Sequence, residues 1–167
     1  MARTSRSTQK PQTTPFEHRE IRIITPFGSA EGYIVDTRAP ELAQWISSQL
    51  RTRKVLATDL LATIQTIYTK IAILENLYVD DQHRNERYGT TLFHQFAQNV
   101  YEDQAQAILL VADNGNQNNF TLFDWYQKLG FKTLAPTTSG PLMSRSDLHT
   151  HYLFPKNTPP PHPRETP

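Results

Sequence analysis

The chain has 167 residues, a formal net charge of +1 and no cysteine, which excludes disulfides and thiolate chemistry. Its length suits one domain with a buried core, and its near-neutral charge indicates no general preference for nucleic acid, acidic substrates or a membrane surface. No apolar run approaches the roughly 20 residues of a transmembrane helix, and the polar, basic start lacks the apolar centre of a secretory signal. We therefore expect a cytoplasmic protein without a membrane partner.

Three segments of different composition divide the sequence. Residues 1–15 are polar and basic, with too little apolar surface to offset the cost of ordering, and are predicted to be a disordered tail. Residues 16–156 carry the periodic apolar pattern of a folded domain. Residues 157–167 are rich in proline and predict a second disordered tail.

The domain begins with predicted strands and continues with predicted helices. Two short apolar runs around turn residues predict a hairpin over residues 20–36. Residues 40–50 open with proline and carry an apolar stripe at helical spacing, which predicts a helix. Residues 57–68 fit a helix and a strand alike, because their apolar spacing is helical while several of them are β-branched. We interpret them as a helix followed by a strand.

Residues 71–100 combine a strand, a polar loop and a helix. The run from 71 to 79 is mostly apolar, which predicts a strand buried on both faces, and residues 88–101 have the apolar spacing of an amphipathic helix. The loop between them carries three basic or potentially basic side chains: His83, Arg84 and Arg87. Because a helix N-terminus has unpaired N–H groups and the positive end of the dipole, this order can form an anion site. An ordinary solvated connection explains the same residues equally well.

The second half of the domain again alternates strand and helix. Residues 107–112 predict another buried strand, which should lie parallel to the first with a right-handed crossover. A helix over about 120–129 should end at Gly130, since glycine favours helix C-caps. Beyond it we expect a strand, a loop and a last strand, over residues 131–135, 136–147 and 149–154. The predicted fold class is therefore α/β, with a mixed central sheet and helices on both faces.

Two short motifs stand in order between residues 71 and 131. The strand Ile73–Val79 is followed by Arg84-Asn-Glu-Arg-Tyr-Gly89, and Asn119 is followed by Trp125-Tyr-Gln-Lys-Leu-Gly-Phe131. The first motif resembles the acetyl-CoA-binding motif of the GNAT superfamily of N-acetyltransferases, in which a Leu-x-Val strand precedes an Arg/Gln-x-x-Gly-x-Gly/Ala loop and a helix. The second is similar to the superfamily's Asn ahead of a Tyr-x-x-x-Gly-Phe helix end.

This resemblance implies a single GNAT-like domain that transfers an acetyl group from acetyl-CoA to a primary amine of a small molecule or a protein. It implies that Tyr126 is the general acid for the leaving thiolate and that Glu75 is a base acting through water. The residues that would bind acetyl-CoA are Leu77, Val79, Arg84, Arg87, Tyr88, Gly89, Thr90 and Asn119. We expect no metal and no nucleic-acid partner, because positive charge is not sustained along the chain; a homodimer is compatible with the sequence.

The phosphate loop departs from the superfamily pattern. Arg87 stands at the position of its first glycine and Asn85 replaces another, so only Gly89 remains. Glycine serves there because a Cβ would keep backbone N–H groups away from the pyrophosphate. The segment directly before the first motif also lacks the glycine-marked hairpin that the resemblance implies.

Each candidate therefore has an alternative. The protein as a whole could be a non-catalytic domain of the same fold that acts as a binding or interaction module. Tyr126 is also explained as a core aromatic. Glu75, a carboxylate on an apolar strand, either lines a cavity or faces solvent.

Overall fold

The computed structural model describes residues 18–84, 87–113 and 122–146. The predictions for the two tails, for the last strand over residues 149–154 and for Asn85 and Asn119 fall outside these ranges.

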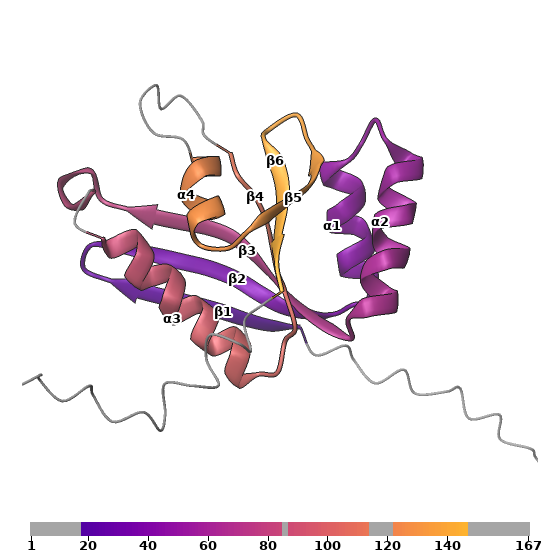
Figure 1. Ribbon diagram of the computed structural model, residues 1–167. Helices are drawn as coiled ribbons and strands as arrows, with labels where there is room; N and C mark the ends of the chain where they lie inside the picture. Colours follow the sequence, from indigo (N-terminus) through magenta and orange to yellow (C-terminus); the bar gives the residue numbers. More distant parts are fainter. Residues whose placement is uncertain (1–17, 85–86, 114–121, 147–167) are drawn as a thin grey trace, which may run out of the picture.

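The described residues form one sheet with helices on both faces (Figure 1). The strands are β1 (Arg19–Thr25), β2 (Gly28–Asp36), β3 (Lys70–Val79), β4 (Ile108–Val111), β5 (Lys132–Pro136) and β6 (Pro141–Arg145). The helices are α1 (Pro40–Gln49), α2 (Lys54–Ile67), α3 (Tyr88–Glu102) and α4 (Leu122–Lys128), with a 3-10 turn at Asp81–His83. The sheet order is β1-β2-β3-β4-β6-β5, and among these strands only the β3–β4 pair is parallel. This mixed sheet confirms the predicted α/β class.

Most elements lie where the sequence predicts them. The predicted hairpin is β1 with β2, paired from Arg19↔Ile34 to Thr25↔Gly28. The parallel β3 and β4 are joined through α3, as the strand–helix–strand pattern requires. α4 ends two residues before Gly130, whose φ of 93° is the left-handed conformation expected at a helix end.

Residues 54–67 form one helix, α2, so the strand predicted at the end of this segment is wrong. The helical spacing of the apolar residues outweighs the β-branched side chains, because it buries Ala57 and Ile64 in a core cluster with residues of the sheet. Three threonines that favour strands locally are accommodated, since each hydroxyl donates to the carbonyl oxygen four residues earlier: Thr58, Thr63 and Thr66.

Residues 141–145 form β6, so the loop predicted over residues 136–147 is wrong. Proline, glycine and serine suggested turns, but Leu142 and Met143 are fully buried. Met143 belongs to the core cluster that includes the buried residues of α3, which we call the α3 cluster, and Leu142 belongs to the cluster that includes those of α1 and α2 on the opposite face of the sheet. Pro141 begins the strand, a position where the missing N–H is tolerated. β6 lies between β4 and β5 and pairs antiparallel with both.

A β-bulge in β3 sets which side chains reach the core. The β2–β3 register runs Glu31↔Asn76 and then Gly32↔Leu74. Glu75 is therefore the extra residue, and after it the two-residue side-chain period is shifted by one. This shift lets Leu74 before the bulge and Leu77 and Val79 after it pack into one cluster beneath α3. The prediction of burial on both faces holds for residues 71–74 and is wrong for residues 75–79, which are exposed or half-buried.

The glycines expected directly before β3 in sequence lie in β2, two helices upstream. A Cβ at Gly28 would overlap the Tyr78 carbonyl oxygen, and one at Gly32 would overlap the Ile73 carbonyl oxygen. The glycine-marked strand therefore packs against β3 as the resemblance implies, although α1 and α2 separate the two strands along the chain.

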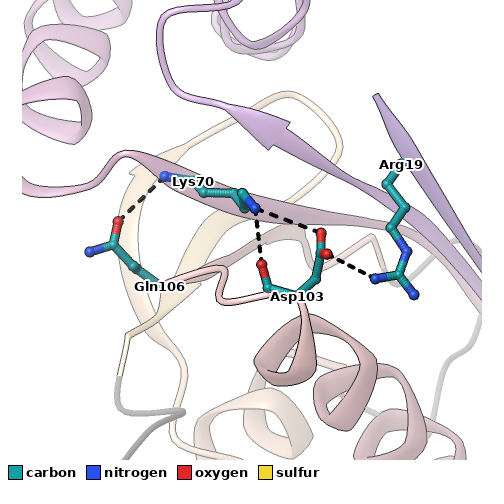
Figure 2. A network of polar contacts seen from close by, with 4 residues as sticks. All are labelled: Arg19, Lys70, Asp103 and Gln106. Carbon is teal, nitrogen blue, oxygen red and sulfur yellow. Dashed lines mark hydrogen bonds and ion pairs between the residues drawn. The ribbon is translucent and has the colours of Figure 1, made fainter. Parts of the chain in front are cut away.

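Polar contacts fasten the start of β3 to the segment between α3 and β4 (Figure 2). The Lys70 N–H donates to the Gln106 side-chain oxygen (3.3 Å), and the Lys70 ammonium donates to the Asp103 carbonyl oxygen (3.1 Å). The Asp103 carboxylate lies 3.0 Å from the Arg19 guanidinium and 4.0 Å from the Lys70 ammonium. These contacts hold β1, β3 and the approach to β4 together at one end of the sheet.

We predict that Gly32→Ala destabilises the fold. The added Cβ would overlap the Ile73 carbonyl oxygen, which cannot move without shifting β3, and would press on the Phe96 ring at 3.0 Å. Overpacking of this kind costs about 1–3 kcal/mol, so the melting temperature should fall by at least about 3 °C. Gly89→Ala is the matched control, because the atom nearest to its Cβ would be 3.5 Å away. Equal melting temperatures for the two variants would contradict this packing.

Candidate functional site

β3 and β4 separate soon after they meet (Figure 1). They pair only at Ala72↔Ile108 and Ile73↔Leu109. Farther on, β3 continues along β2 to Val79, while β4 continues along β6 to Val111. Among the described residues, the backbone of residues 74–79 therefore has no strand partner on its β4 side, and we call this stretch the open seam. An extended ligand can pair with its N–H and C=O groups as a strand would.

The last peptide groups of the open seam have a defined direction. The Asp80 N–H donates to the Phe27 carbonyl oxygen (2.8 Å) on the hairpin side, so the alternation of a strand turns the Val79 N–H and C=O toward the open seam. The Arg84 Nε–H donates to the Val79 carbonyl oxygen (3.3 Å). Val79 thus presents its backbone to the open seam, while its side chain and that of Leu77 are half-buried beneath α3.

Aromatic rings fix the loop between the open seam and α3. Phe27, at the turn of the hairpin, stacks on Tyr88 with ring centroids 3.8 Å apart. His83 meets the Tyr88 ring edge-on at 5.4 Å. Because Tyr88 is the first residue of α3, these contacts set the start of the helix relative to β3.

Arg87, which stands at the position of the superfamily's first loop glycine, adopts a backbone conformation that glycine takes most easily. Its φ of 64° and ψ of 13° are left-handed, and it is the N-cap residue of α3. A non-glycine residue pays about 1–2 kcal/mol for this conformation. The loop therefore contains a left-handed turn although no glycine stands there. The Arg87 side chain is exposed and has no ion pair with any described residue.

The N-terminus of α3 has no competing acceptor within the described ranges. No side chain caps it, and its first turn contains no acid. A Cβ at Gly89 would stand 3.5 Å from Trp125 and 3.6 Å from Val79, which are ordinary contact distances. The fold itself therefore does not require glycine at this position. The free N–H groups of Tyr88, Gly89 and Thr90 and the helix dipole can attract an anion.

Arg84 is already engaged, in contrast to Arg87. Its guanidinium pairs with the exposed Asp81 carboxylate at 2.9 Å, in addition to its bond with Val79. An exposed pair of this kind is worth little, about 0–1 kcal/mol, and an anionic ligand can compete for it. Arg84 thus contributes to the shape of the loop in the structure described.

Glu75 is exposed, so it faces solvent at the bulge. Its charge acts on Tyr33 of β2: burial first, and then the carboxylates of Glu75 and Glu41, raise the pKa of the Tyr33 hydroxyl to about 12. The sequence analysis did not predict Tyr33 or Glu41 as site residues. Their interaction depends on the β2–β3 register and on where α1 begins, and neither residue stands in a motif.

Tyr126 is buried, with 5% of its surface exposed. Its ring packs against Trp125 (centroids 4.9 Å) and Phe131 (5.4 Å). It belongs to the same buried cluster as Leu74, the first residue of the open seam, and Ala112, the residue that follows β4. Burial raises the pKa of Tyr126 far above its ordinary value, so the phenol stays neutral and keeps its proton.

Within the described ranges, every helix is too short or too polar to span a membrane. These ranges also contain no group of three or more His, Asp or Glu side chains that could hold a metal ion.

The sequence model of the FR47-like protein family matches residues 52–138, just over half of the chain. The chain is a member of the FR47-like family. This family is related to the GNAT superfamily, so the resemblance of the two motifs is confirmed. No curated protein matches the chain.

Solved structures of other proteins are similar to this FR47-like protein. Arylalkylamine N-acetyltransferase 2 from Aedes aegypti has a TM-score of 0.52 and 14% identity, over 76% of this chain and 72% of its own. A bacterial toxin has a TM-score of 0.52 and 15% identity, over 80% and 66%. The PaiA N-acetyltransferase from Thermoplasma acidophilum, solved with coenzyme A, has a TM-score of 0.46 and 17% identity over 72% of this chain, which spans only 53% of that enzyme. The family match and the two structures with a TM-score of 0.52 confirm the predicted GNAT-like fold.

We predict that Arg87→Gly stabilises this FR47-like protein, because glycine adopts the left-handed conformation without a Cβ penalty. The gain should be about 1 kcal/mol, reduced by the greater freedom of glycine in the unfolded chain, and thermal unfolding should show it as a rise of a few degrees. Gln104→Gly, at the other positive φ of a non-glycine residue (62°), is the control and should behave alike. A fall for Arg87→Gly beside a rise for Gln104→Gly would mean that the arginine side chain itself supports the loop.

Proposed function

We propose that this FR47-like protein transfers an acetyl group from acetyl-CoA to a primary amine. The observation that carries the proposal is the open seam of β3 beside the uncapped N-terminus of α3. The pantetheine part of acetyl-CoA is extended and carries amides that need backbone partners, and its pyrophosphate needs N–H donors and positive charge. Both needs are met along one strand–loop–helix unit, so one ligand can use both.

The pyrophosphate would lie at the first turn of α3. The N–H groups of Tyr88, Gly89 and Thr90 would donate to its oxygens, and the exposed Arg87 guanidinium would add a charge-assisted contact. Arg84 would approach the same oxygens once they displace the Asp81 carboxylate. Asn119 stays a proposed contact by its place in the second motif.

The thioester would lie along the open seam near Val79. The Val79 N–H, turned toward the open seam, would polarise the thioester oxygen. The neutral amine would then attack the carbonyl carbon, and the C–S bond would break as the amide forms. Tyr126 would donate its hydroxyl proton to the departing sulfur and regain a proton from solvent. Its place in the buried cluster that includes Leu74, the first residue of the open seam, supports this role.

Glu75 would remove the proton that the amine loses. The carboxylate lies at the bulge, two residues past the last β3–β4 pair, and it is exposed, so ordered water can connect it to the amine. This fits a base acting through water. The proton balance then closes, because one proton leaves through Glu75 and one enters through Tyr126.

We predict that backbone approach and positive charge both matter for acetyl-CoA binding. Gly89→Ala should leave the melting temperature unchanged or slightly higher, since its Cβ has room and alanine favours helices. It should nevertheless weaken acetyl-CoA binding, because the methyl group stands between the N–H groups and the pyrophosphate. Arg84→Ala with Arg87→Ala should weaken binding at least about tenfold, or about 1.4 kcal/mol, and more at low salt.

Isothermal titration of acetyl-CoA measures both effects. Arg51→Ala with Arg53→Ala, two exposed arginines next to the turn between α1 and α2, is the control with the same change in net charge. If both double variants bind acetyl-CoA equally well, any loss of affinity comes from the change in net charge, and the pyrophosphate binds elsewhere.

We predict that Tyr126→Phe removes the acid and little else. The ring keeps its packing, so the melting temperature and acetyl-CoA affinity should hardly change, while turnover should fall by roughly 10²–10⁴-fold. Free-thiol release with a panel of primary amines at several pH values is the assay. Because burial raises the pKa of Tyr126, the parent should show no loss of activity from its ionisation up to about pH 9. Tyr68→Phe, at a partly buried tyrosine of the opposite cluster, is the control.

The non-catalytic alternative makes a different prediction in the same assay. A parent protein that neither binds acetyl-CoA nor gains thermal stability from it would be an interaction module of the same fold. A Tyr126→Phe variant as fast as the parent would leave acetyl transfer in place and remove the assignment of the acid.

A further inference from the structure

β1 lies at one edge of the sheet, and no described strand pairs with its outer side (Figure 1). The hydrogen-bonding direction of β1 follows from that of β2. The Phe27 carbonyl oxygen accepts from the Asp80 N–H on the β3 side, so Gly28 and every second residue after it face β1. Their register partners, which are the odd-numbered residues of β1, face β2. The even-numbered residues, Glu20 and Arg22 among them, therefore turn their N–H and C=O groups to the free edge.

The two edges of the sheet differ in how they are protected against another chain. β5, at the other edge, is five residues long, shifts register between Thr133 and Ala135, and contains Lys132 and Pro136. Short length, a bulge, lysine and proline all hinder pairing with an edge strand. β1 is seven residues long, runs with β2 in unbroken register and contains neither lysine nor proline. β1 is therefore the edge that can accept another strand.

The charges on the exposed face of β1 fit a second copy of the same strand. Glu20 is exposed and forms no ion pair with any described residue, while Arg22 contacts Glu31 at 3.3 Å and keeps 63% of its side chain exposed. When two copies of β1 pair antiparallel about Ile21, Glu20 of each copy lies directly opposite Arg22 of the other. Both residues face the free edge, so they also exchange backbone hydrogen bonds. The same surface thus meets itself, as a two-fold interface requires.

Other registers lose this complementarity. Backbone groups that face the edge must meet groups that face the edge, so the centre of the pair can move only by whole residues. A pair centred on Arg22 opposes the two Arg22 side chains, and a pair centred on Glu20 opposes the two Glu20 side chains. Like charges directly opposite each other destabilise a sheet. A pair centred on Ile23 leaves Glu20 without an opposing residue in β1. The charges therefore favour the pair centred on Ile21.

The helices of the two copies leave room for this pairing. α3 packs on β1, β2 and β3, so it is centred near β2. The spacing of neighbouring strands would put the β2 strands of the two copies roughly 14 Å apart, and packed helices need only about 8–10 Å between their axes. The two α3 helices can therefore lie side by side on one face of the joined sheet. Because β5 resists pairing, the assembly would stop at two copies.

We propose that two copies of this chain pair antiparallel through β1, centred on Ile21, and join their sheets into one. The backbone hydrogen bonds supply the attraction, and the two contacts between Glu20 and Arg22 select the register. The pairing uses none of the residues proposed to bind acetyl-CoA or to transfer the acetyl group. It therefore stands or falls independently of the proposed function.

Sedimentation equilibrium of the full chain over a range of concentrations tests the pairing, and the parent should form a dimer. Arg22→Glu and Glu20→Arg each place like charges opposite each other twice, so each should raise the dimer dissociation constant at least about tenfold. An equimolar mixture of the two variants again places opposite charges together at both positions, so it should form a mixed dimer with nearly the parent's affinity. Lys132→Glu, on the β5 edge, changes the net charge as Arg22→Glu does and should leave the dimer unchanged.

A second variant tests the backbone contacts. Glu20→Pro removes an N–H that faces the free edge and that the β1–β2 pair does not use, so the protein should still fold while the dimer is lost. Melting temperatures of all variants check folding. A parent that is monomeric at every concentration, as it would be if another segment of the chain covered this edge, would overturn the proposal. A dimer that survives Arg22→Glu or Glu20→Pro, or a loss that mixing does not reverse, would overturn it equally.

Discussion

The fold depends on a parallel pairing of β3 and β4 that is only two residues long. So short a pair needs support, and the contacts of Lys70 with Asp103 and Gln106 supply it at the amino end of β3 (Figure 2). At the other end each strand keeps a partner, β2 for β3 and β6 for β4, so the two can part without losing their place in the sheet. An edge of unpaired backbone is thereby held inside a stable sheet, where a ligand can complete it.

The bulge at Glu75 assigns different chemistry to the two faces of the sheet. It shifts the side-chain period by one, which returns Leu77 and Val79 to the α3 cluster and leaves the carboxylate outside it. A regular strand would have turned these two apolar side chains away from α3. One extra residue therefore allows the same strand to support a helix N-terminus that attracts anions and to place an acid on the opposite side. The separation of charge follows from register alone.

The sequence was informative where burial and local signals agree, and misleading where they compete. An apolar stripe at helical spacing located α3, and Gly130 marked the end of α4. β6 was missed since its proline and neighbouring glycine look like a turn, although its centre is fully buried. The influence of the Glu41 charge on the Tyr33 hydroxyl could not be predicted, because it depends on strand register and helix placement. No local pattern records such pairings.

The left-handed backbone of Arg87 is an argument that the loop before α3 binds an anion. A loop without a ligand could relax into an unstrained conformation, since the substitution of glycine removes the only residue type that takes a left-handed turn freely. The turn persists, held between the rings of Phe27 and Tyr88 on one side and the first hydrogen bonds of α3 on the other. Backbone strain of about 1–3 kcal/mol is typically kept where the surrounding structure over-determines it, and such positions cluster at ligand-binding sites. The arginine also adds, at the start of the helix, the positive charge that a phosphate would meet. The replacement thus costs stability and gains charge in the same place.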